Sequence, residues 1–288
     1  MNDRIALLLA TRKRPDKLLR ALESFGALAA RVDKLVAVIG IDDDDEESIA
    51  VARTYAGKTG VLWSIAPREL TLGHLWNRLA RLGHACDILA LSVDDYVMRT
   101  EGWDEGYRSA VSLMPKGYGT AFPADPLHPG RCTLPVITRR LMDRMGFFVP
   151  PWFPFWFHDS WLGELGSYIA CLLPVAVAVD APDGRGATNN IRDLAFWSEL
   201  FEATRPMRVD VAKGLIEEMY ANQPGLLINV FNNMPGVVMH HVAVRQRVML
   251  KWAKDRKLDE IASVDVSPRY REAKRRAEGL LAQLQRPA

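Results

Sequence analysis

The sequence lacks the features that mark several common classes of protein. Its 288 residues include only three cysteines, and none of them belongs to a CxxC pair. This count and spacing argue against a disulfide framework and a zinc knuckle, and they favour a reducing environment. No GxGxxG motif follows the first apolar run, and no GxxxxGK[ST] motif occurs anywhere. A dinucleotide enzyme or a P-loop ATPase would therefore have no glycine loop for its phosphates.

A strong net charge and long apolar runs are also absent. The chain has 37 basic and 35 acidic residues and a formal net charge of +2, so no overall field favours nucleic acid or an anionic membrane as a partner. The apolar run after Arg4 spans only about seven residues, fewer than a signal peptide needs. The apolar run at residues 169–179 is interrupted by Pro174. We therefore predict no membrane span and a cytoplasmic location.

The first half of the sequence alternates apolar β-type runs with amphipathic stretches. This alternation indicates βαβ units and a parallel sheet covered by helices. Pro15 suits the first position of a helix, a second helix is expected to start near Glu46, and Thr71 is a suitable cap for a third. The predicted strands lie at residues 5–11, 34–41, 61–66 and 87–93.

The second half has a different texture. After a helix predicted at residues 103–114, we expect strands at 120–124 and 172–180, and between them a strand running into a short helix that Gly146 ends. The aromatic stretch at residues 147–157 contains three prolines, which rule out a regular element through its middle.

The remaining sequence predicts a loop and then helices. Residues 181–194 are rich in Gly, Asn and Asp, which is typical of a mobile loop. The sequence that follows is mainly helical and ends in a basic stretch. We therefore expect an α/β core at residues 1–194, with a Rossmann-like first half, and a helical C-terminal extension at residues 195–288.

Charged and polar side chains gather directly after the four predicted strands of the first half. Ligands of open α/β sheets bind at the carboxyl ends of the strands, so these side chains are expected to meet in one site. Cations there suit phosphate groups, and carboxylates suit ribose hydroxyls, a base edge or a metal. Taken singly, each group is also consistent with a solvated turn or a helix start. The set comprises Thr11, Arg12, Arg14, the run from Asp42 to Asp45, Arg68, Asp94 and Asp95.

The order of these motifs resembles a known group of enzymes. ATRKRP follows the first strand, GIDDDD the second, TLGHLWNRLARLG contains an Asn, an Asp pair ends the fourth strand, and HDSWL comes later. In this order they look like the nucleotide-sugar glycosyltransferases of the GT-A fold, nearest to the family 2-like group. The resemblance covers roughly residues 4–180 and extends to a C-terminal histidine. It implies a GT-A mixed sheet flanked by helices, with the C-terminal helices completing the site.

The resemblance implies a divalent metal, Mn²⁺ or Mg²⁺. Asp94 and Asp95 match the metal-binding DxD motif, with Asp95 as the direct ligand, although Tyr96 replaces its usual final Asp. His240 or His241 matches a histidine that some GT-A enzymes bring back to the metal, and histidine suits Mn²⁺ better than Mg²⁺. If the segment VVMHHVAVRQR is extended, only one of these two neighbours reaches the site.

The resemblance also implies which residues meet the nucleotide sugar. Thr11 and Arg14 would lie by the uracil or ribose, and Asp42 would accept hydrogen bonds from the base or ribose. An exposed helix position is an equally good explanation of Asn77, and a structural role is the favoured explanation of Trp103. The predicted nucleotide-binding residues are Thr11, Arg12, Arg14, Asp42, Asn77 and Asp94.

Asp159 of HDSWL matches the general base of inverting members of this group. Bulky neighbours would raise the pKa of its carboxyl by desolvation, which suits a group that takes a proton from an acceptor hydroxyl. If the reaction retains configuration, Asp159 is a binding residue instead. Trp103, Trp156 and His158 are predicted to contact the sugar or the acceptor, and core packing is the alternative for the aromatic cluster.

These observations predict a hexosyltransferase-type glycosyltransferase that uses a nucleotide sugar, with a UDP-sugar favoured. The acceptor is a glycan, a lipid-linked intermediate, a protein or a modified nucleic acid. One alternative is a noncatalytic GT-A-like module that binds a nucleotide or a glycan, because Tyr96 departs from the motif. Another is a sugar nucleotidyltransferase, which usually has a glycine-rich loop after the first strand that ATRKRP lacks.

Overall fold

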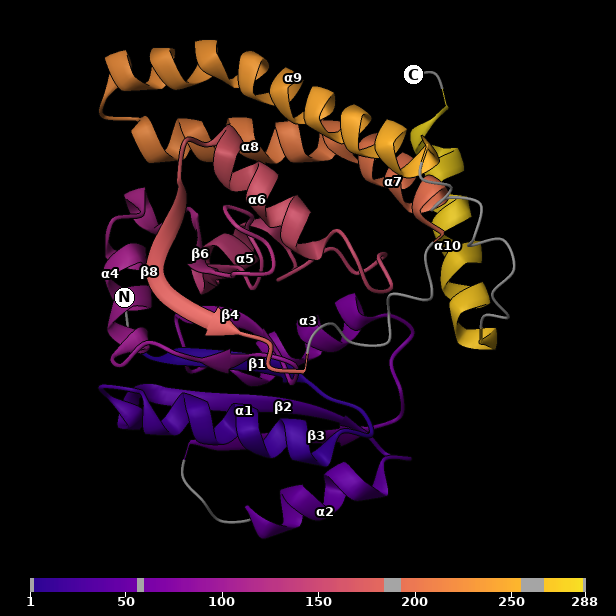
Figure 1. Cartoon of the computed structure of the whole chain (residues 1–288). Coiled ribbons are helices and arrows are strands. Elements are labelled where there is room, and N and C mark those ends of the chain that lie inside the picture. Colours follow the sequence, from indigo (N-terminus) through magenta and orange to yellow (C-terminus); the bar gives the residue numbers. More distant parts are fainter. Residues whose placement is uncertain (1–2, 56–59, 184–192, 255–266, 287–288) are drawn as a thin grey trace.

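The computed structural model describes residues 3–55, 60–183, 193–254 and 267–286 (Figure 1). The strands of these residues form one mixed sheet in the order β3-β2-β1-β4-β7-β6-β8-β5. The pairs β1–β2, β2–β3, β1–β4 and β6–β8 are parallel, whereas β4–β7, β6–β7 and β5–β8 are antiparallel. The strands are β1 Ile5–Ala10, β2 Leu35–Asp42, β3 Val61–Ala66, β4 Ile88–Val93, β5 Val97–Met98, β6 Thr120–Ala124, β7 Val136–Thr138 and β8 Leu172–Asp180.

Helices surround this sheet. In Figure 1, α8 and α9 run side by side along one end of the molecule, α2 lies at the opposite end, and α10 stands beside α7. The helices are α1 Pro15–Ala27, α2 Glu46–Thr54, α3 Leu72–Leu82, α4 Trp103–Ser112, α5 Arg139–Met145, α6 His158–Tyr168, α7 Leu194–Ala203, α8 Arg205–Tyr220, α9 Pro224–Lys254 and α10 Pro268–Leu284, with short 3₁₀ turns η1 Val32–Lys34 and η2 Pro115–Gly117.

The apolar runs of the first half form four adjacent parallel strands, β3-β2-β1-β4, with β3 at the edge of the sheet, and so confirm the predicted parallel arrangement. Every residue of β1 and β2 is buried, which explains why these strands show continuous apolar runs and not alternation. Helix α1 begins at Pro15 and buries Leu18, Leu22 and Phe25. Helix α3 begins after Thr71, whose hydroxyl accepts a hydrogen bond from the His74 backbone N–H.

The second half also follows its predicted order. The end of the short helix agrees with the prediction, and two other places differ from it. The short helix α5 ends at Gly146, which has a left-handed φ of 81°, a conformation that glycine adopts at little cost. The HDSWL motif begins helix α6, which the sequence analysis did not predict. The expectation of an extended segment around His240 is wrong, because this segment lies within the long helix α9. The predicted loop at residues 181–194 falls largely on residues 184–192, outside the described part of the chain.

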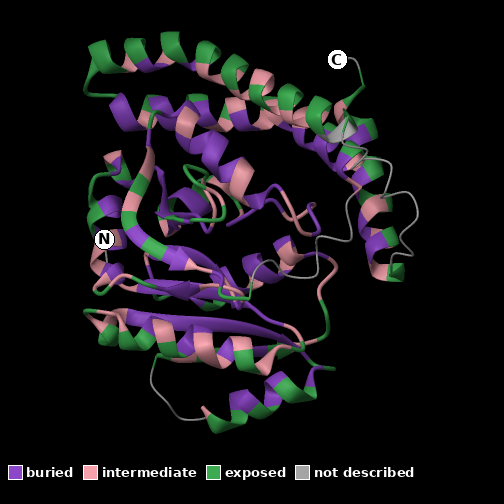
Figure 2. Ribbon diagram, in the orientation of Figure 1, coloured by how far each residue is buried: buried purple, intermediate pink, exposed green. Residues whose placement is uncertain are grey.

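Buried residues concentrate in the sheet and in the helix faces packed on it, whereas the outer face of α9 is exposed (Figure 2). None of the helices in the described ranges is both long enough and apolar enough to cross a membrane. The proposed boundary between residues 194 and 195 stays a prediction.

Candidate functional site

The candidate site begins where the central strands β1 and β4 end. These strands are parallel and in register, so that Ala10 pairs with Val93, and the residues after them emerge side by side. The Thr11 hydroxyl donates a hydrogen bond of 2.7 Å to Asp94 Oδ2. Burial raises the pKa of the Asp94 carboxyl, while the Thr11 hydrogen bond and the nearby Arg14 oppose that rise.

Two cations hold the carboxylate pair. Arg14 Nη1 lies 3.1 Å from Asp94 Oδ1 and 2.8 Å from Asp95 Oδ1. Lys17 Nζ donates to the same Asp95 oxygen at 2.6 Å. Burial lowers the pKa of Arg14, but the two carboxylates raise it more, so its net shift is upward. The sequence analysis missed Lys17, although it follows Arg14 by three residues at the start of a helix, a spacing that places both on one face.

The acidic run after β2 has several roles. Asp42, at the end of the strand, is buried and accepts from Arg12 Nη1 at 2.6 Å, with Arg68 Nε at 3.4 Å. Asp44 pairs with Arg12 on the surface. Asp45 instead accepts hydrogen bonds from the backbone N–H groups of Ser48 and Lys13, and so caps α2 and fixes the turn after β1.

Asn77 is buried and fully engaged with backbone groups. Its Nδ2 donates to the carbonyls of Gly73 and Val149 at 2.7 Å each. Its Oδ1 accepts from the N–H groups of Phe148 and Val149. The side chain therefore ties α3 to the segment before the aromatic loop. It is not an exposed helix residue, and its nucleotide-binding role stays a prediction that these contacts do not favour.

The three aromatic residues predicted to contact the sugar or acceptor lie in different surroundings. Trp103 is completely buried on α4 and donates from Nε1 to the Phe25 carbonyl at 3.2 Å. His158 is buried against Trp76, and burial lowers the pKa of its imidazole to about 3, so it is neutral. Trp156 is half-buried in the aromatic loop.

Asp159 stands in the first turn of α6, in surroundings that disfavour its charge. Burial raises the pKa of its carboxyl. The Ser160 backbone N–H, which donates to Oδ1 at 2.7 Å, and the nearby Arg245 and His128 lower this pKa but do not cancel the effect of burial. Asp159 in turn contributes to the raised pKa of the Cys132 thiol, whose main cause is burial. The surroundings of Asp159 thus agree with those predicted for a base, and its catalytic role stays a prediction.

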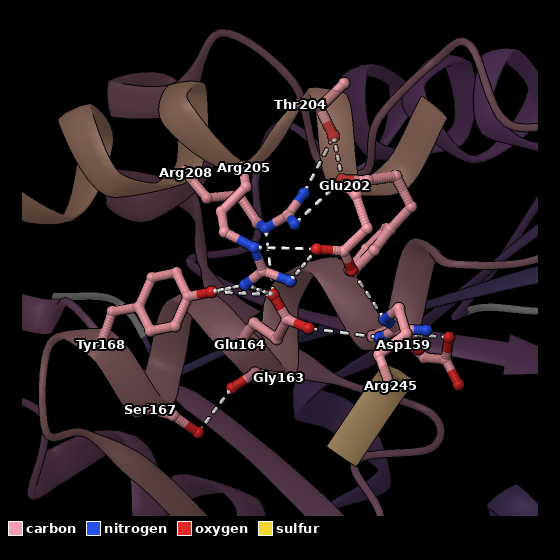
Figure 3. A network of polar contacts seen from close by, with 12 residues as sticks. Asp159, Gly163, Glu164, Ser167, Tyr168, Glu202, Thr204, Arg205, Arg208 and Arg245 are labelled. Atoms are coloured by element: carbon pink, nitrogen blue, oxygen red, sulfur yellow. Dashed lines mark hydrogen bonds and ion pairs between the residues drawn. The ribbon is translucent and has the colours of Figure 1, made fainter. Parts of the chain in front are cut away.

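A network of buried charges lies one turn along the same helix (Figure 3). Glu164 is 3% exposed and its carboxylate lies 3.0 Å from Arg205, 3.2 Å from Arg208 and 3.2 Å from Arg245. The Tyr168 hydroxyl donates to Glu164 at 2.9 Å. Figure 3 shows Arg245 of α9 between Glu164 and Asp159. The C-terminal helices therefore reach the predicted base.

The implied metal fits the carboxylate pair only in part. No group of three or more His, Cys, Asp or Glu side chains within the described ranges is arranged to hold a metal ion. Asp95 Oδ1 is shared by two cations, and Tyr96, at the third DxD position, donates its hydroxyl to Asp125 at 2.9 Å. One or two carboxylates suffice for a cation whose remaining ligands are substrate phosphates and water, and the Asp pair fits that arrangement.

The two candidate histidines are not brought into such a cluster. His240 is exposed on α9 and packs edge-on against His241. His241 packs in the same way against Tyr168, whose hydroxyl belongs to the Glu164 network. A metal role for His240 stays a prediction without support from the contacts of the described residues.

The fold is that of an open α/β protein with a mixed sheet, and charged side chains gather at the carboxyl ends of β1, β2 and β4. Comparison with solved structures shows that the fold is that of GT-A glycosyltransferases. S. aureus TarS in complex with UDP-GlcNAc matches over 90% of this chain and 89% of its own, with a TM-score of 0.56 and 9% identity. The mannosyltransferase PcManGT from Pyrobaculum calidifontis, in complex with GDP-Man and Mn²⁺, matches over 96% of this chain and 87% of its own, with a TM-score of 0.54 and 12% identity.

A third solved structure extends the comparison. GalNAc-T7 with UDP, GalNAc and Mn²⁺ matches over 71% of this chain and 51% of its own, with a TM-score of 0.52 and 11% identity. No protein-family model and no curated protein matches the sequence. Identities this low establish the fold, and function has to be argued from the site.

Proposed function

We propose that this protein is a glycosyltransferase that moves a sugar from a nucleoside diphosphate sugar to an acceptor hydroxyl. The observation that carries the proposal is the contact between Arg14, Lys17, Asp94 and Asp95 at the carboxyl edge of β1 and β4. Such a site offers cations to a diphosphate and carboxylates to ribose or metal, and it needs no glycine loop. TarS and GalNAc-T7, which share the fold, were solved with UDP-GlcNAc and UDP, which supports a UDP-sugar as donor.

The buried side chains at the strand ends would orient the nucleoside. Thr11 and Asp94 would meet the ribose, and Asp42, held by Arg12, would accept hydrogen bonds from the base. Asp42 and Asp94 are both buried, and carboxylates in such surroundings form strong hydrogen bonds with donors of a bound ligand. Their existing contacts hold both groups in place before the donor arrives.

The cations would stabilise the leaving diphosphate. Negative charge develops on this group as the glycosidic bond breaks, and fixed positive charges are the most effective stabilisers of such a change. Arg14 and Lys17 are placed for this task at the Asp pair. Asp95, with Asp94, would hold a divalent cation, Mn²⁺ or Mg²⁺, which supplies Lewis-acid stabilisation of the same charge when bound. PcManGT and GalNAc-T7 were both solved with Mn²⁺.

Asp159 would act as the base. Its raised pKa makes the carboxylate a better proton acceptor than an ordinary aspartate, as removal of the acceptor hydroxyl proton requires. Attack by that hydroxyl opposite the departing diphosphate would invert the anomeric carbon. Arg245 of α9, which pairs with Glu164 at 3.2 Å and lies close to Asp159, lowers the pKa of the Asp159 carboxyl and would so favour the ionised form of the base. In this way the C-terminal helices would complete the catalytic core.

One observation favours a noncatalytic nucleotide or glycan binding protein as a second candidate. Tyr96 occupies the third DxD position, and its hydroxyl donates to Asp125, which also accepts from the Thr133 hydroxyl and the Leu127 backbone N–H. The position is therefore used to hold a loop. Slow hydrolysis of a UDP-sugar by the purified protein distinguishes an enzyme from such a binding protein.

Titration calorimetry with UDP, GDP, ADP and CDP, each with and without Mn²⁺, tests the proposal. We expect one diphosphate to bind tightly, with binding strengthened by the metal. The Asp95→Ala variant should lose the metal-dependent part of its affinity for the diphosphate. It should keep its thermal unfolding temperature, because Asp95 lies outside the core at a strand edge. Binding of none of the four by the wild type, or unchanged metal-dependent affinity in Asp95→Ala, contradicts the proposal.

A further inference from the structure

The C-terminal helix α10 carries an arginine toward the nucleotide side of the candidate site. Arg269 is the second residue of this helix, and its neighbour Tyr270 is firmly anchored. The Trp197 indole N–H donates to the Tyr270 hydroxyl at 2.7 Å, and the Tyr270 ring stacks on Phe155 with an interplanar angle of 10°. These contacts fix the first turn of α10 against α7 and the aromatic loop, so the backbone position of Arg269 is well defined.

The Arg269 side chain reaches the loop that follows β3. Its Nη1 donates to the Glu69 carbonyl, next to Arg68, whose Nε lies 3.4 Å from Asp42. Burial, and then the like charge of Arg68, lower the pKa of Arg269 to about 10, and Asp42 only partly offsets this. Arg12 and Arg68 thus pair with the Asp42 carboxylate, and Arg269 lies on the loop next to Arg68, near enough for the charges of all three to shift its pKa.

The Arg269 guanidinium has no anionic partner among the residues that the structure describes. Within the described ranges of the chain, no carboxylate lies within ion-pair distance of it, and its Nε is buried without a hydrogen-bond partner. Arg12 is by contrast paired with two carboxylates, Asp42 and Asp44. A half-buried guanidinium with an unused N–H beside two like charges is stabilised by an oxygen-rich, anionic ligand.

We propose that Arg269 is a direct ligand of the donor nucleotide, to which it donates hydrogen bonds from its guanidinium. This inference rests on the proposed function, because it assumes that a nucleoside diphosphate sugar occupies the site around Asp42 and Asp94. It adds that the last helix of the described chain supplies part of the donor site. Donor binding is consequently coupled to the docking of α10 on α7 and the aromatic loop.

Calorimetric titration of UDP against the wild type, Arg269→Ala and Arg269→Lys tests the proposal. Loss of a charge-assisted hydrogen bond weakens binding by roughly 10-fold or more, so we expect at least this loss in Arg269→Ala and partial recovery in Arg269→Lys. Arg275→Ala is the matched control, since Arg275 lies on the exposed side of the same helix and pairs with Glu272. Its affinity should stay within about 2-fold of the wild type.

Hydrogen exchange of the wild-type protein, with and without UDP, separates ligation from a merely structural role. We expect UDP to slow exchange of the backbone amides in the first turn of α10. If the wild type binds UDP while Arg269→Ala binds equally well, or while the α10 amides are unaffected, the inference is wrong and the proposed function stands. If the wild type binds none of UDP, GDP, ADP and CDP, the proposed function itself fails.

Discussion

Lys17 Nζ lies 2.6 Å from Asp95 Oδ1 and so occupies the carboxylate that the DxD motif assigns to a metal. Arg14 Nη1 approaches the same oxygen at 2.8 Å. A divalent cation on Asp95, as proposed, would therefore compete with Arg14 and Lys17 for this oxygen. Both side chains would have to move away from Asp95 to make room for it.

Replacement of Lys17 by Met should tighten metal binding. The variant keeps most of the aliphatic side chain and removes one positive charge. The apparent affinity for Mn²⁺ in the presence of UDP should therefore rise by roughly 2- to 5-fold, the size of a partly exposed ion pair. Titration of Mn²⁺ into the UDP complex measures this. Weaker Mn²⁺ binding in Lys17→Met would mean that Lys17 assists the metal and does not compete with it.

Asp159→Asn should remove the proposed base while leaving the donor site intact. A general base contributes about 10² to 10⁴ in rate, so kcat for sugar transfer should fall by that factor and the Kd for UDP should stay unchanged. The substitution keeps the size of the side chain. A variant that retains full kcat would assign Asp159 to binding, as a retaining reaction requires.

The pH dependence of kcat/KM should also reflect the raised pKa of the Asp159 carboxyl. The carboxyl must be ionised to accept a proton, so kcat/KM should fall as pH is lowered through its pKa, with a midpoint above the 3.8 of an ordinary aspartate. Arg245 lowers this pKa, so Arg245→Gln should move the midpoint to still higher pH. A pH profile of kcat/KM for both proteins is the measurement, and identical midpoints would contradict the assignment.

Glu164→Ala should destabilise the fold strongly. Removing one partner of a buried charge network costs about 3–5 kcal/mol, here because three arginines lose their shared carboxylate. Urea denaturation measures the loss. Glu272→Ala, which removes only surface ion pairs of α10, should leave the unfolding midpoint unchanged. A similar midpoint for both variants would show that the network adds little to stability.

The same network should make stability depend on acidity. Burial alone raises the pKa of Glu164, but Arg208, Arg205 and Arg245 together lower it below its ordinary value of 4.5. The pKa of Glu164 is therefore lower in the folded state than in the unfolded state. The contribution of its carboxylate to the free energy of unfolding is complete above pH 4.5, and it is lost as the pH falls through the pKa of the folded state. The acid side of the stability profile should flatten in Glu164→Ala.

Asn77→Asp should weaken the fold and spare nucleotide affinity. The substitution removes the Nδ2 donor to the Gly73 and Val149 carbonyls and places a carboxylate beside them. Unsatisfied buried groups cost about 1–3 kcal/mol, which urea denaturation resolves. Asn233→Asp, at an exposed position of α9, is the control. Unchanged stability combined with weaker UDP binding would instead restore the predicted nucleotide role.

The sequence predicted the core elements well because their signals are local. The four strands of the first half are continuous apolar runs, and Pro15 and Thr71 mark helix starts by their own chemistry. The same locality explains why residues after the strands were recognised as a group. Thr11 and Asp94 do meet, because parallel strands in register deliver their ends to one edge.

What the sequence did not predict depends on long-range packing. The sequence did not distinguish Asn77 from an exposed residue, since three of its four hydrogen bonds join it to Phe148 and Val149, more than 70 positions later in the chain. The sequence did not indicate a site role for Arg269, because its neighbours Arg68 and Glu69 come about 200 positions earlier in the chain.

The central place of β1 has a consequence during synthesis. This strand leaves the ribosome before its two partners, β2 and β4, which end only at Asp42 and Val93. Until the second partner has emerged, the apolar segment IALLLA has at least one unpaired edge, and exposed edges of this kind invite aggregation. A nascent chain stalled between these points is therefore a natural client for a chaperone.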